Sequence, residues 1–283
     1  MKIAVTGASG FVGRHVLAAL RTHGVDVVAV TRDAAHLNGV VASARIVEMD
    51  IASPPENCFK HLGSPDALIH LAWDGLPNYR SLHHFETELP RQYQFLKSMV
   101  EGGLSSMLVT GTCFEYGMQS GALSEEMPPQ PNNPYGYAKN ALCQQLQYLK
   151  SERPFNLVWA RLFYMYGEGQ AATSLYPMLR EAVLRGDRVF NMSGGEQLRD
   201  YLPVEEVACH IVRLAMAQQD IGAVNICSGK PVSVRRLAEQ WLLENNWKIE
   251  LNLGCYPYPD YEPMAFWGDR HKLDESLGND GAT

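Results

Sequence analysis

The sequence predicts an α/β fold in which helices cover both faces of a doubly wound parallel sheet. Two observations support it: short apolar strands alternate with amphipathic helices through about residue 165, and a glycine-rich turn follows the first strand. Strands buried on both faces read as continuous apolar runs. After residue 165 the alternation loosens. We therefore expect a main domain over residues 1–165 and a smaller lobe over 166–283, with some segments of the lobe returning to the sheet.

The expected strands of the main domain cover residues 2–6, 26–30, 45–48, 67–70, 106–110 and 156–160. The first is an apolar run that the glycine-rich turn ends, and the second reads Asp-Val-Val-Ala-Val. The first helix, over residues 11–22, has apolar residues on one side at helical spacing. Further helices are expected over 81–101 and 135–151, and in the lobe over 173–185, 204–217 and 233–246. The lobe also contains short strands and proline-rich segments.

Composition limits the class of protein. The chain has 283 residues, 46% hydrophobic and 19% charged, as in soluble globular proteins. A net charge of −7 argues against nucleic acid as a partner, since nucleic-acid binding needs a basic surface. The six cysteines show no paired spacing, so we expect no disulfide framework, no metal site and a cytoplasmic location. No apolar run approaches the ~20 residues of a membrane span, and the opening residues leave no room for a signal peptide.

The turn after the first strand reads Gly7-Ala-Ser-Gly-Phe-Val-Gly13 and opens a helix. A glycine pattern between a buried strand and a helix is typical of a dinucleotide-binding loop. Gly7 allows the tight turn, Gly10 lets a pyrophosphate approach the backbone, and Gly13 permits close helix–strand packing. The pyrophosphate would lie at the helix N-terminus. The alternative is a structural turn without a ligand. We expect a Rossmann-like fold that binds a nicotinamide dinucleotide.

The end of the second strand should select the cofactor. An acidic residue there binds the ribose hydroxyls of NAD, whereas an arginine suits the 2′-phosphate of NADP. The chain has Thr31 at this position, followed by Arg32 and by Asp33, which can cap the next turn. These residues favour NADP(H) as the cofactor and leave NAD(H) possible. The alternative is that Arg32 is a solvated surface residue that does not contact the cofactor.

Tyr135 and Lys139 are four residues apart and lie on one face of their predicted helix. A tyrosine hydroxyl titrates near ~10, and a neighbouring ammonium group lowers that pKa. The pair can therefore exchange a proton with a carbonyl/alcohol couple. The spacing is weak evidence alone, because surface helices produce it often.

Together these motifs resemble the extended short-chain dehydrogenase/reductases, specifically the branch that modifies nucleotide sugars, nearly end to end. The resemblance implies that Thr112, in the segment ending Tyr116-Gly117, acts with Tyr135 and Lys139 in catalysis. It implies a cofactor site formed by Gly7, Ser9, Gly10, Phe11, Val12, Gly13, Arg32, Asp50, Ile51, Leu71, Ala72, Thr110, Tyr135, Lys139 and Leu162. We expect a substrate site that includes Trp73, Cys113, Phe114, Tyr164 and Arg199. The alternatives are core aromatic residues for Trp73 and Tyr164 and a surface arginine for Arg199.

Departures from the family pattern narrow the expected activity. Dehydratases of this branch have Asp and Glu after the catalytic Thr, whereas this chain has Cys113 and Phe114. Glu115 comes one place later and faces differently if the segment is extended. Tyr164 replaces the usual substrate-contacting Asn. A second arginine near the diphosphate is missing from residues 259–264, which leaves Arg199 as the expected phosphate ligand.

We therefore expect reduction of a keto group, at C4 of a nucleotide-linked deoxysugar, with hydride from NADPH and a proton from Tyr135. Thr112 would hydrogen-bond the carbonyl oxygen, and Lys139 would hold the nicotinamide ribose. The alternatives are a 4-epimerase with tightly bound NAD, in which Cys113 could serve as a further acid or base, and a non-catalytic dinucleotide sensor. By analogy with relatives, helices 81–101 and 135–151 would form a homodimer interface.

Overall fold

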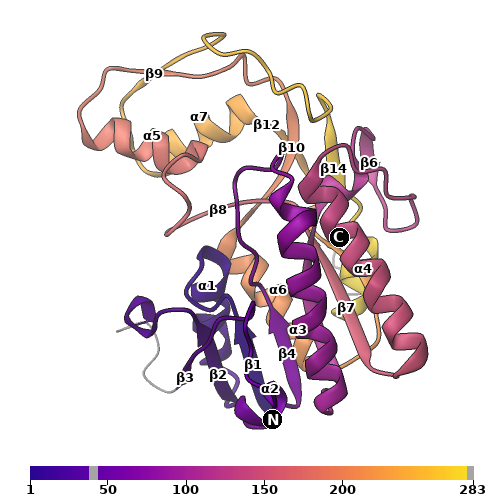
Figure 1. Ribbon diagram of the computed structural model, residues 1–283. Helices are drawn as coiled ribbons and strands as arrows, with labels where there is room; N and C mark the ends of the chain where they lie inside the picture. Colours follow the sequence, from indigo (N-terminus) through magenta and orange to yellow (C-terminus); the bar gives the residue numbers. More distant parts are fainter. Residues whose placement is uncertain (38–43, 279–283) are drawn as a thin grey trace.

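The computed structural model describes residues 1–37 and 44–278. Its centre is a seven-stranded parallel sheet with the order β11-β7-β5-β4-β1-β2-β3 (Figure 1). The strands are β1 (Lys2–Thr6), β2 (Asp26–Thr31), β3 (Arg45–Glu48), β4 (Ala67–His70), β5 (Ser106–Thr112), β7 (Asn156–Leu162) and β11 (Gly222–Ile226). The chain adds strands on one side of β1 up to β3 and then on the other side from β4. Ligands of such sheets bind at the carboxyl ends of the strands where this order reverses.

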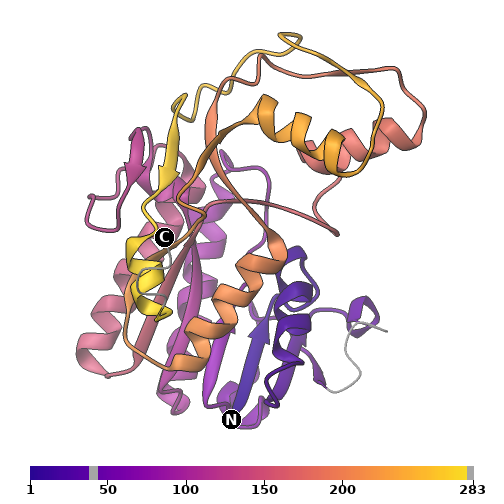
Figure 2. The ribbon, with the colours of Figure 1, turned by 180° about the vertical axis from the view of Figure 1, so that it is seen from behind.

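Helices cover both faces of the sheet. One apolar core joins the sheet to α1 (Phe11–Leu20), α6 (Val204–Ala217) and α8 (His271–Ser276), as Figure 2 shows. The other joins it to α2 (Cys58–His61), α3 (Leu89–Gly102) and α4 (Pro134–Glu152), which lie in front in Figure 1. Each strand is therefore buried on both sides, which explains the continuous apolar runs in the sequence.

A smaller lobe stands above the carboxyl ends of the strands (Figure 1). It has its own apolar core around Trp241, between α5 (Leu175–Leu184) and α7 (Val234–Glu244). Its short strands are β8 (Tyr164–Tyr166), β9 (Val189–Asn191), β10 (Leu198–Pro203), β12 (Pro231–Ser233) and β13 (Glu250–Asn252). A further pair, β6 (Gly121–Leu123) and β14 (Phe266–Gly268), joins the main domain to the last part of the chain.

The structure confirms the predicted α/β fold and its six predicted strands. β5 and β7 each continue two residues beyond the prediction, because they pair in parallel up to Thr112 and Leu162. The predicted helix over 81–101 begins as a wider π-helical turn, η2 (His84–Glu88), followed by α3 with Pro90 in its first turn. β11 comes from the second half of the chain and completes the sheet edge beside β7. The domain boundary at residue 165 stays a prediction.

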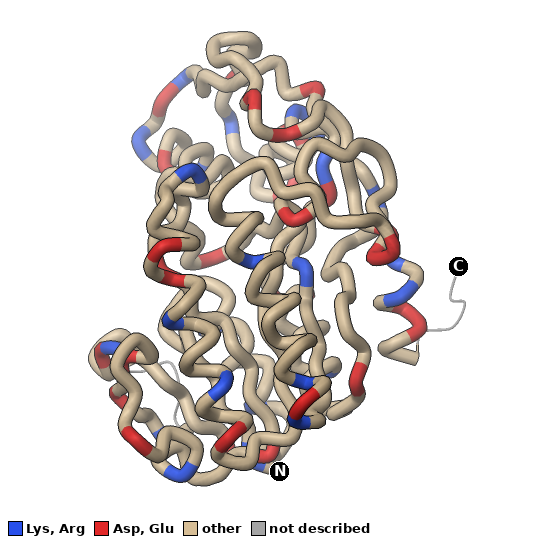
Figure 3. Tube along the Cα trace, turned by 45° about the vertical axis from the view of Figure 1, so that its right-hand side comes forward, with Lys and Arg blue, Asp and Glu red and all other residues tan. Residues whose placement is uncertain are grey.

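Acidic and basic residues are interspersed over both the sheet region and the lobe in the described part of the chain (Figure 3). Among the described residues, no helix has both the length and the apolar character needed to cross a bilayer.

Candidate active site

The glycine loop after β1 has the close contacts that the sequence predicted. Gly7 has a φ of +69°, in the left-handed region that favours glycine. A Cβ atom on Gly13 would lie 2.2 Å from the carbonyl oxygen of Gly7. Gly10 caps α1 without a side chain. The backbone at the start of α1 is therefore open to an approaching anion, and this cradle fits the pyrophosphate of a dinucleotide.

A cleft of about 250 Å³ runs along this loop and the ends of β1, β2 and β4. The predicted cofactor residues that line it are Gly7, Ser9, Gly10, Arg32, Asp50, Ile51, Leu71 and Ala72. Trp73, predicted to contact the sugar, also lines this cleft. Among the lining residues that the sequence did not predict are Asp74, Glu88, Arg91 and Gln92. Glu88, Arg91 and Gln92 lie on η2 and α3 three and four residues apart. This spacing places them on one face of the helix and could have indicated a shared site.

Gly10 offers a test of the cleft as a dinucleotide site. A Cβ atom there would lie 3.2 Å from the Gly7 carbonyl oxygen, a contact that a small shift relieves, and the φ of −72° suits alanine. We expect Gly10→Ala to keep its melting temperature but to weaken NADH binding by about tenfold or more, because the methyl group blocks the pyrophosphate. Gly13→Ala should instead lower the melting temperature. Unchanged NADH fluorescence titration of Gly10→Ala would contradict the assignment.

Side chains at the end of β2 do not form a strong phosphate site. The Thr31 hydroxyl lies 3.0 Å from that of Ser9. The Arg32 side chain is 72% exposed and lies 3.8 Å from Asp74. Asp33 accepts a hydrogen bond from the Ala35 amide, the capping role expected for it. Arg32 is thus the solvated residue of the alternative interpretation, and its charge is partly balanced by Asp74.

Tyr135 lies in the first turn of α4. Asn133 caps this helix by accepting a hydrogen bond of 2.8 Å from the Gly136 amide, and Pro134 fits the first turn. Aromatic rings surround the phenol, with centroid distances of 5.9 Å to Trp73, 5.5 Å to Tyr79, 5.2 Å to His84 and 6.4 Å to Phe114.

The phenol of Tyr135 is held protonated. Burial is the largest effect and raises the pKa of Tyr135, and the hydrogen bond with Thr112 opposes that rise. The expectation that Lys139 lowers this pKa is therefore wrong, since the pKa is raised and the lowering contact is that with Thr112. A protonated phenol beside the Thr112 hydroxyl can donate a proton to a carbonyl oxygen placed between them.

Lys139 lies one helical turn further along α4 and is fully enclosed. Its ammonium group donates a hydrogen bond of 2.8 Å to the Thr110 carbonyl. The ammonium lies 4.0 Å from the centroid of the Trp73 ring and 6.0 Å from that of Tyr135. Burial lowers the pKa of Lys139 to about 7, although Glu115 and then Glu88 act in the opposite direction.

This shift predicts a pH dependence of stability. Folded Lys139 has a pKa of about 7, whereas an unfolded lysine titrates near ~10.4. Between these pH values the unfolded chain binds more protons, so the free energy of unfolding rises with pH and this gain is lost as pH falls to about 7. Urea unfolding of the wild type and Lys139→Met should show a difference that grows in favour of the wild type from neutral to alkaline pH. A difference that is constant over this range would contradict the shift.

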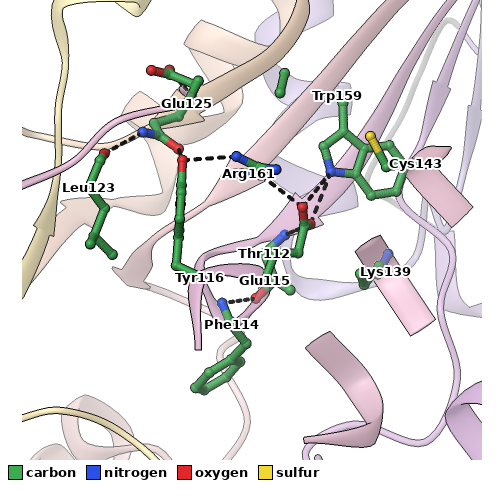
Figure 4. Close-up of polar contacts among 12 residues, drawn as sticks. Thr112, Phe114, Glu115, Tyr116, Leu123, Glu125, Lys139, Cys143, Trp159 and Arg161 are labelled. Carbon is green, nitrogen blue, oxygen red and sulfur yellow. Dashed lines mark hydrogen bonds and ion pairs between the residues drawn. The ribbon is translucent and has the colours of Figure 1, made fainter. Parts of the chain in front are cut away.

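Thr112 ends β5 and starts a 3-10 turn, η3 (Cys113–Tyr116). The segment after Thr112 is not extended, because this turn brings the Glu115 carboxylate back against the Thr112 amide (Figure 4). The Glu115 carboxylate accepts a 2.9 Å hydrogen bond from the Thr112 amide and pairs with Arg161 at 2.8 Å. Trp159 donates to the same carboxylate at 3.0 Å. Glu115 is completely buried and fixes the backbone that carries the Thr112 hydroxyl.

The other four predicted substrate residues are Cys113, Phe114, Tyr164 and Arg199. Cys113 and Phe114 are buried, and burial raises the pKa of the Cys113 thiol, which opposes an acid–base role. Tyr164 donates a 2.6 Å hydrogen bond to Glu262. Arg199, expected to bind phosphate, pairs with the same carboxylate at 2.9 Å. The sequence did not predict Glu262 at this site.

Two histidines, His83 and His84, lie near the cleft. His84 is buried and accepts a 3.1 Å hydrogen bond from the Trp73 indole. Asp74, His83 and Glu88 have ligand atoms within 4.8 Å of one another. Arg32 and Arg91 pair with these two carboxylates, at 3.8 Å and 3.7 Å. The cluster is therefore an ion-pair network.

His70, at the end of β4, is buried and forms hydrogen bonds on both sides of its ring. It lies 2.7 Å from the Thr6 hydroxyl and 2.6 Å from the Gln92 side-chain oxygen. Burial lowers its pKa to about 3, so the ring is neutral at physiological pH.

The fold and the comparisons with known proteins define the class: the protein is an NAD(P)-dependent oxidoreductase of the extended short-chain dehydrogenase/reductase type. Residues 3–227 match the NAD dependent epimerase/dehydratase family, and the chain belongs to this family.

Two characterised relatives illustrate its range. The chain is 33% identical over 270 residues to dTDP-6-deoxy-L-talose 4-dehydrogenase (NAD(+)) of Aggregatibacter actinomycetemcomitans, covering 95% of this chain and 99% of the relative. It is 27% identical to a UDP-glucose 4-epimerase of Corynebacterium glutamicum, covering 84% of this chain and 79% of the relative.

Solved structures agree in fold. MoeE5 in complex with UDP-glucuronic acid and NAD has a TM-score of 0.82 at 28% identity, covering 98% of this chain and 93% of that one. A UDP-glucose 4-epimerase from Stenotrophomonas maltophila with bound NAD has a TM-score of 0.86 at 20% identity, with 98% and 92% covered. The similarity to MoeE5 and to the 33% identical relative supports a nicotinamide dinucleotide as cofactor.

Proposed function

We propose that this protein interconverts the C4 alcohol and the 4-ketone of a nucleotide-linked 6-deoxyhexose, and that it works as a reductase at neutral pH. The observation that supports this most is the protonated, enclosed Tyr135 beside the Thr112 hydroxyl. The similarity to two nucleotide-linked 6-deoxytalose 4-dehydrogenases, at 33% and 27% identity, supports C4 and a 6-deoxyhexose.

The bound dinucleotide would supply or accept hydride at C4. Tyr135 would donate a proton to the ketone oxygen, and Thr112 would hydrogen-bond that oxygen and orient it. Lys139 would bind the nicotinamide ribose and supply positive charge near the developing oxyanion. Residues 166–283 would hold the nucleotide and the sugar.

For the cofactor we propose NAD(H), in place of the NADP(H) that Arg32 favoured in the sequence. Arg32 is largely exposed and partly balanced by Asp74, which weakens it as a 2′-phosphate ligand. The name of the 33% identical relative specifies NAD(+). Titration with NADH and NADPH separates the two. Tighter binding of NADH supports the proposal, and tighter binding of NADPH restores the original preference.

A nucleotide-sugar 4-epimerase is the second candidate, because a curated UDP-glucose 4-epimerase is among the relatives. An epimerase retains NAD and returns hydride to the other face of the same ketone, whereas a reductase releases its cofactor in each cycle. Purified protein should therefore contain little NAD and should oxidise added NADH when given nucleotide-linked 4-keto-6-deoxyhexoses. Stoichiometric bound NAD, with sugar interconversion but no net NADH oxidation, would favour the epimerase. If none of these nucleotide sugars is converted, the result would favour a non-catalytic dinucleotide sensor.

The role proposed for Thr112 has its own test. Thr112→Val keeps the shape and the buried position of the side chain but removes the hydroxyl. We expect kcat to fall by about 10²–10³, because the lost hydrogen bond acts mainly in the transition state. Ser at this position should restore most of the rate, and an unchanged kcat in Thr112→Val would reduce Thr112 to a packing residue.

We also propose a cytoplasmic homodimer built on α3 and α4, which lie side by side in Figure 1. Tyr148 on α4 is 76% exposed and would be covered in such a pair. Sedimentation of Tyr148→Glu against the wild type tests this interface, since a charge there should favour the monomer.

A further inference from the structure

The guanidinium of Arg199 is held in a fixed place at the base of the lobe. Its side chain is 4% exposed. Nη1 donates hydrogen bonds to the carbonyls of Leu198 and Met264, at 2.9 Å and 3.2 Å. The centre of the guanidinium lies 4.5 Å from the centroid of the Phe266 ring. These contacts direct the remaining N–H groups, on Nε and Nη2, to one ligand.

Glu262 takes both of these donors. One of its oxygens, Oε2, lies 2.9 Å from Nε and 2.9 Å from Nη2 of Arg199, and it accepts a 2.6 Å hydrogen bond from the Tyr164 hydroxyl. The Glu262 side chain is only 9% exposed. An arginine binds phosphate through the same type of side-on N–H pair. Glu262 therefore occupies the donors that a phosphate on Arg199 would need.

Glu262 belongs to a segment, residues 255–263, that we call the strap. It connects β13 to β14, and most of it is exposed. Its other polar contacts lie nearer the surface. Asp260 pairs with Arg80, the Tyr258 hydroxyl donates to Glu196 at 2.7 Å, and the Tyr261 carbonyl accepts from Asn132 at 3.2 Å. Such exposed contacts contribute little stability, so the strap depends on Glu262 for its inward anchor.

The strap also touches the catalytic centre through aromatic rings. Tyr261 lies 6.2 Å from Phe114, Phe114 lies 4.9 Å from Tyr79, and Tyr79 lies 5.5 Å from Tyr135, measured between ring centroids. The strap therefore covers the side of the site that faces the lobe.

We infer that Glu262 is an internal competitor for the substrate's diphosphate: its carboxylate neutralises Arg199 until a nucleoside diphosphate displaces the strap. This inference rests on the proposed function, since it requires a nucleotide-linked substrate. A buried arginine without a partner is costly, so a carboxylate in the free protein keeps the guanidinium in place. A diphosphate carries more charge and more acceptor oxygens, so it can replace one carboxylate. The observed affinity is then lowered by the fraction of molecules in which the strap is closed.

The test is calorimetric titration of the full chain, loaded with NAD, with UDP and with dTDP. Glu262→Gln keeps the size of the side chain and removes its charge. We expect Glu262→Gln to bind one or both nucleotides about tenfold more tightly than the wild type. The matched control is Asp260→Asn, which breaks the exposed Arg80 pair on the same strap and should change affinity by about twofold or less. In the double variant with Arg199→Gln the gain should disappear.

Hydrogen exchange of the wild type gives a second measurement that needs no variant. Addition of UDP or dTDP should speed exchange at residues 255–262, whereas a ligand that merely packs beneath the strap would slow it. Equal or weaker nucleotide binding by Glu262→Gln, or slower exchange of the strap, overturns the inference.

Turnover is measured separately with the nucleotide-sugar panel. Tighter diphosphate binding by Glu262→Gln without turnover of any nucleotide sugar would overturn the proposed function and support the strap. Turnover of a nucleotide sugar with unchanged diphosphate binding in Glu262→Gln would support the proposed function and overturn the inference about the strap.

Discussion

Tyr135→Phe should lower kcat for ketone reduction by about 10²–10⁴, the usual contribution of a positioned proton donor. The Tyr135 phenol forms a hydrogen bond with the Thr112 side chain. Four aromatic rings bury the phenol, and burial keeps it protonated. Phenylalanine preserves those ring contacts and removes only the hydroxyl. The loss should therefore be in chemistry and not in folding.

Two measurements separate the role of Tyr135 from a structural one. NADH binding, followed by fluorescence, should be unchanged in Tyr135→Phe, and the melting temperature should be close to that of the wild type. Tyr137→Phe is the matched control, because Tyr137 lies two residues further on α4 and is 54% exposed. It should retain full activity. Near-normal turnover by Tyr135→Phe would refute the assignment of the proton donor.

The direction of the raised Tyr135 pKa adds a consequence for pH. Reduction needs the protonated phenol, whereas oxidation of the alcohol needs the phenolate as base. Reduction should therefore proceed at neutral pH, and the reverse oxidation should speed up as the pH becomes alkaline. Tyr135→Phe should lose this alkaline limb together with its activity.

Glu115→Ala should lower the free energy of unfolding by about 3–5 kcal/mol, because it leaves the Arg161 guanidinium buried without its partner. The pair is deeply enclosed, with side-chain exposures of 0% for Glu115 and 4% for Arg161. The same carboxylate also accepts from the Thr112 amide and from the Trp159 indole. The substitution therefore leaves three buried donors without their acceptor.

Urea unfolding of Glu115→Ala and of a matched control checks this value. Glu239→Ala removes the exposed pair with Arg235 on α7, and such pairs contribute about 0–1 kcal/mol. Glu115→Gln should fall between the two, because the amide oxygen can still accept from the Thr112 amide. A loss in Glu115→Ala no larger than that of Glu239→Ala would show that the cluster is a minor part of the core.

The sequence predicted the sheet well because its information is local. Each apolar run, such as residues 2–6, is ended by a turn. A short apolar run between a turn and a helix is typical of a buried parallel strand. The glycine loop was equally legible, since only glycine fits at Gly7 and Gly13. Tyr135 and Lys139 were identified by spacing on one helix.

What the sequence did not predict depends on contacts between distant residues. Glu262 lies 63 positions after Arg199, and no local pattern links them. The position of the Glu115 side chain depends on a 3-10 turn, in which its carboxylate accepts a hydrogen bond from the Thr112 amide. His84 is buried because it accepts a hydrogen bond from the indole of Trp73, which lies 11 positions earlier.

The position of β11 has a consequence for how this enzyme can diversify. The strand pairs with β7 at the edge of the sheet, and the chain passes through one part of the lobe before it and through the rest after it. Cutting out the lobe as a cassette would strip that edge and leave the backbone of β7 free to pair with other molecules. New substrate preferences are therefore more accessible through single replacements around the strap than through recombination of whole modules.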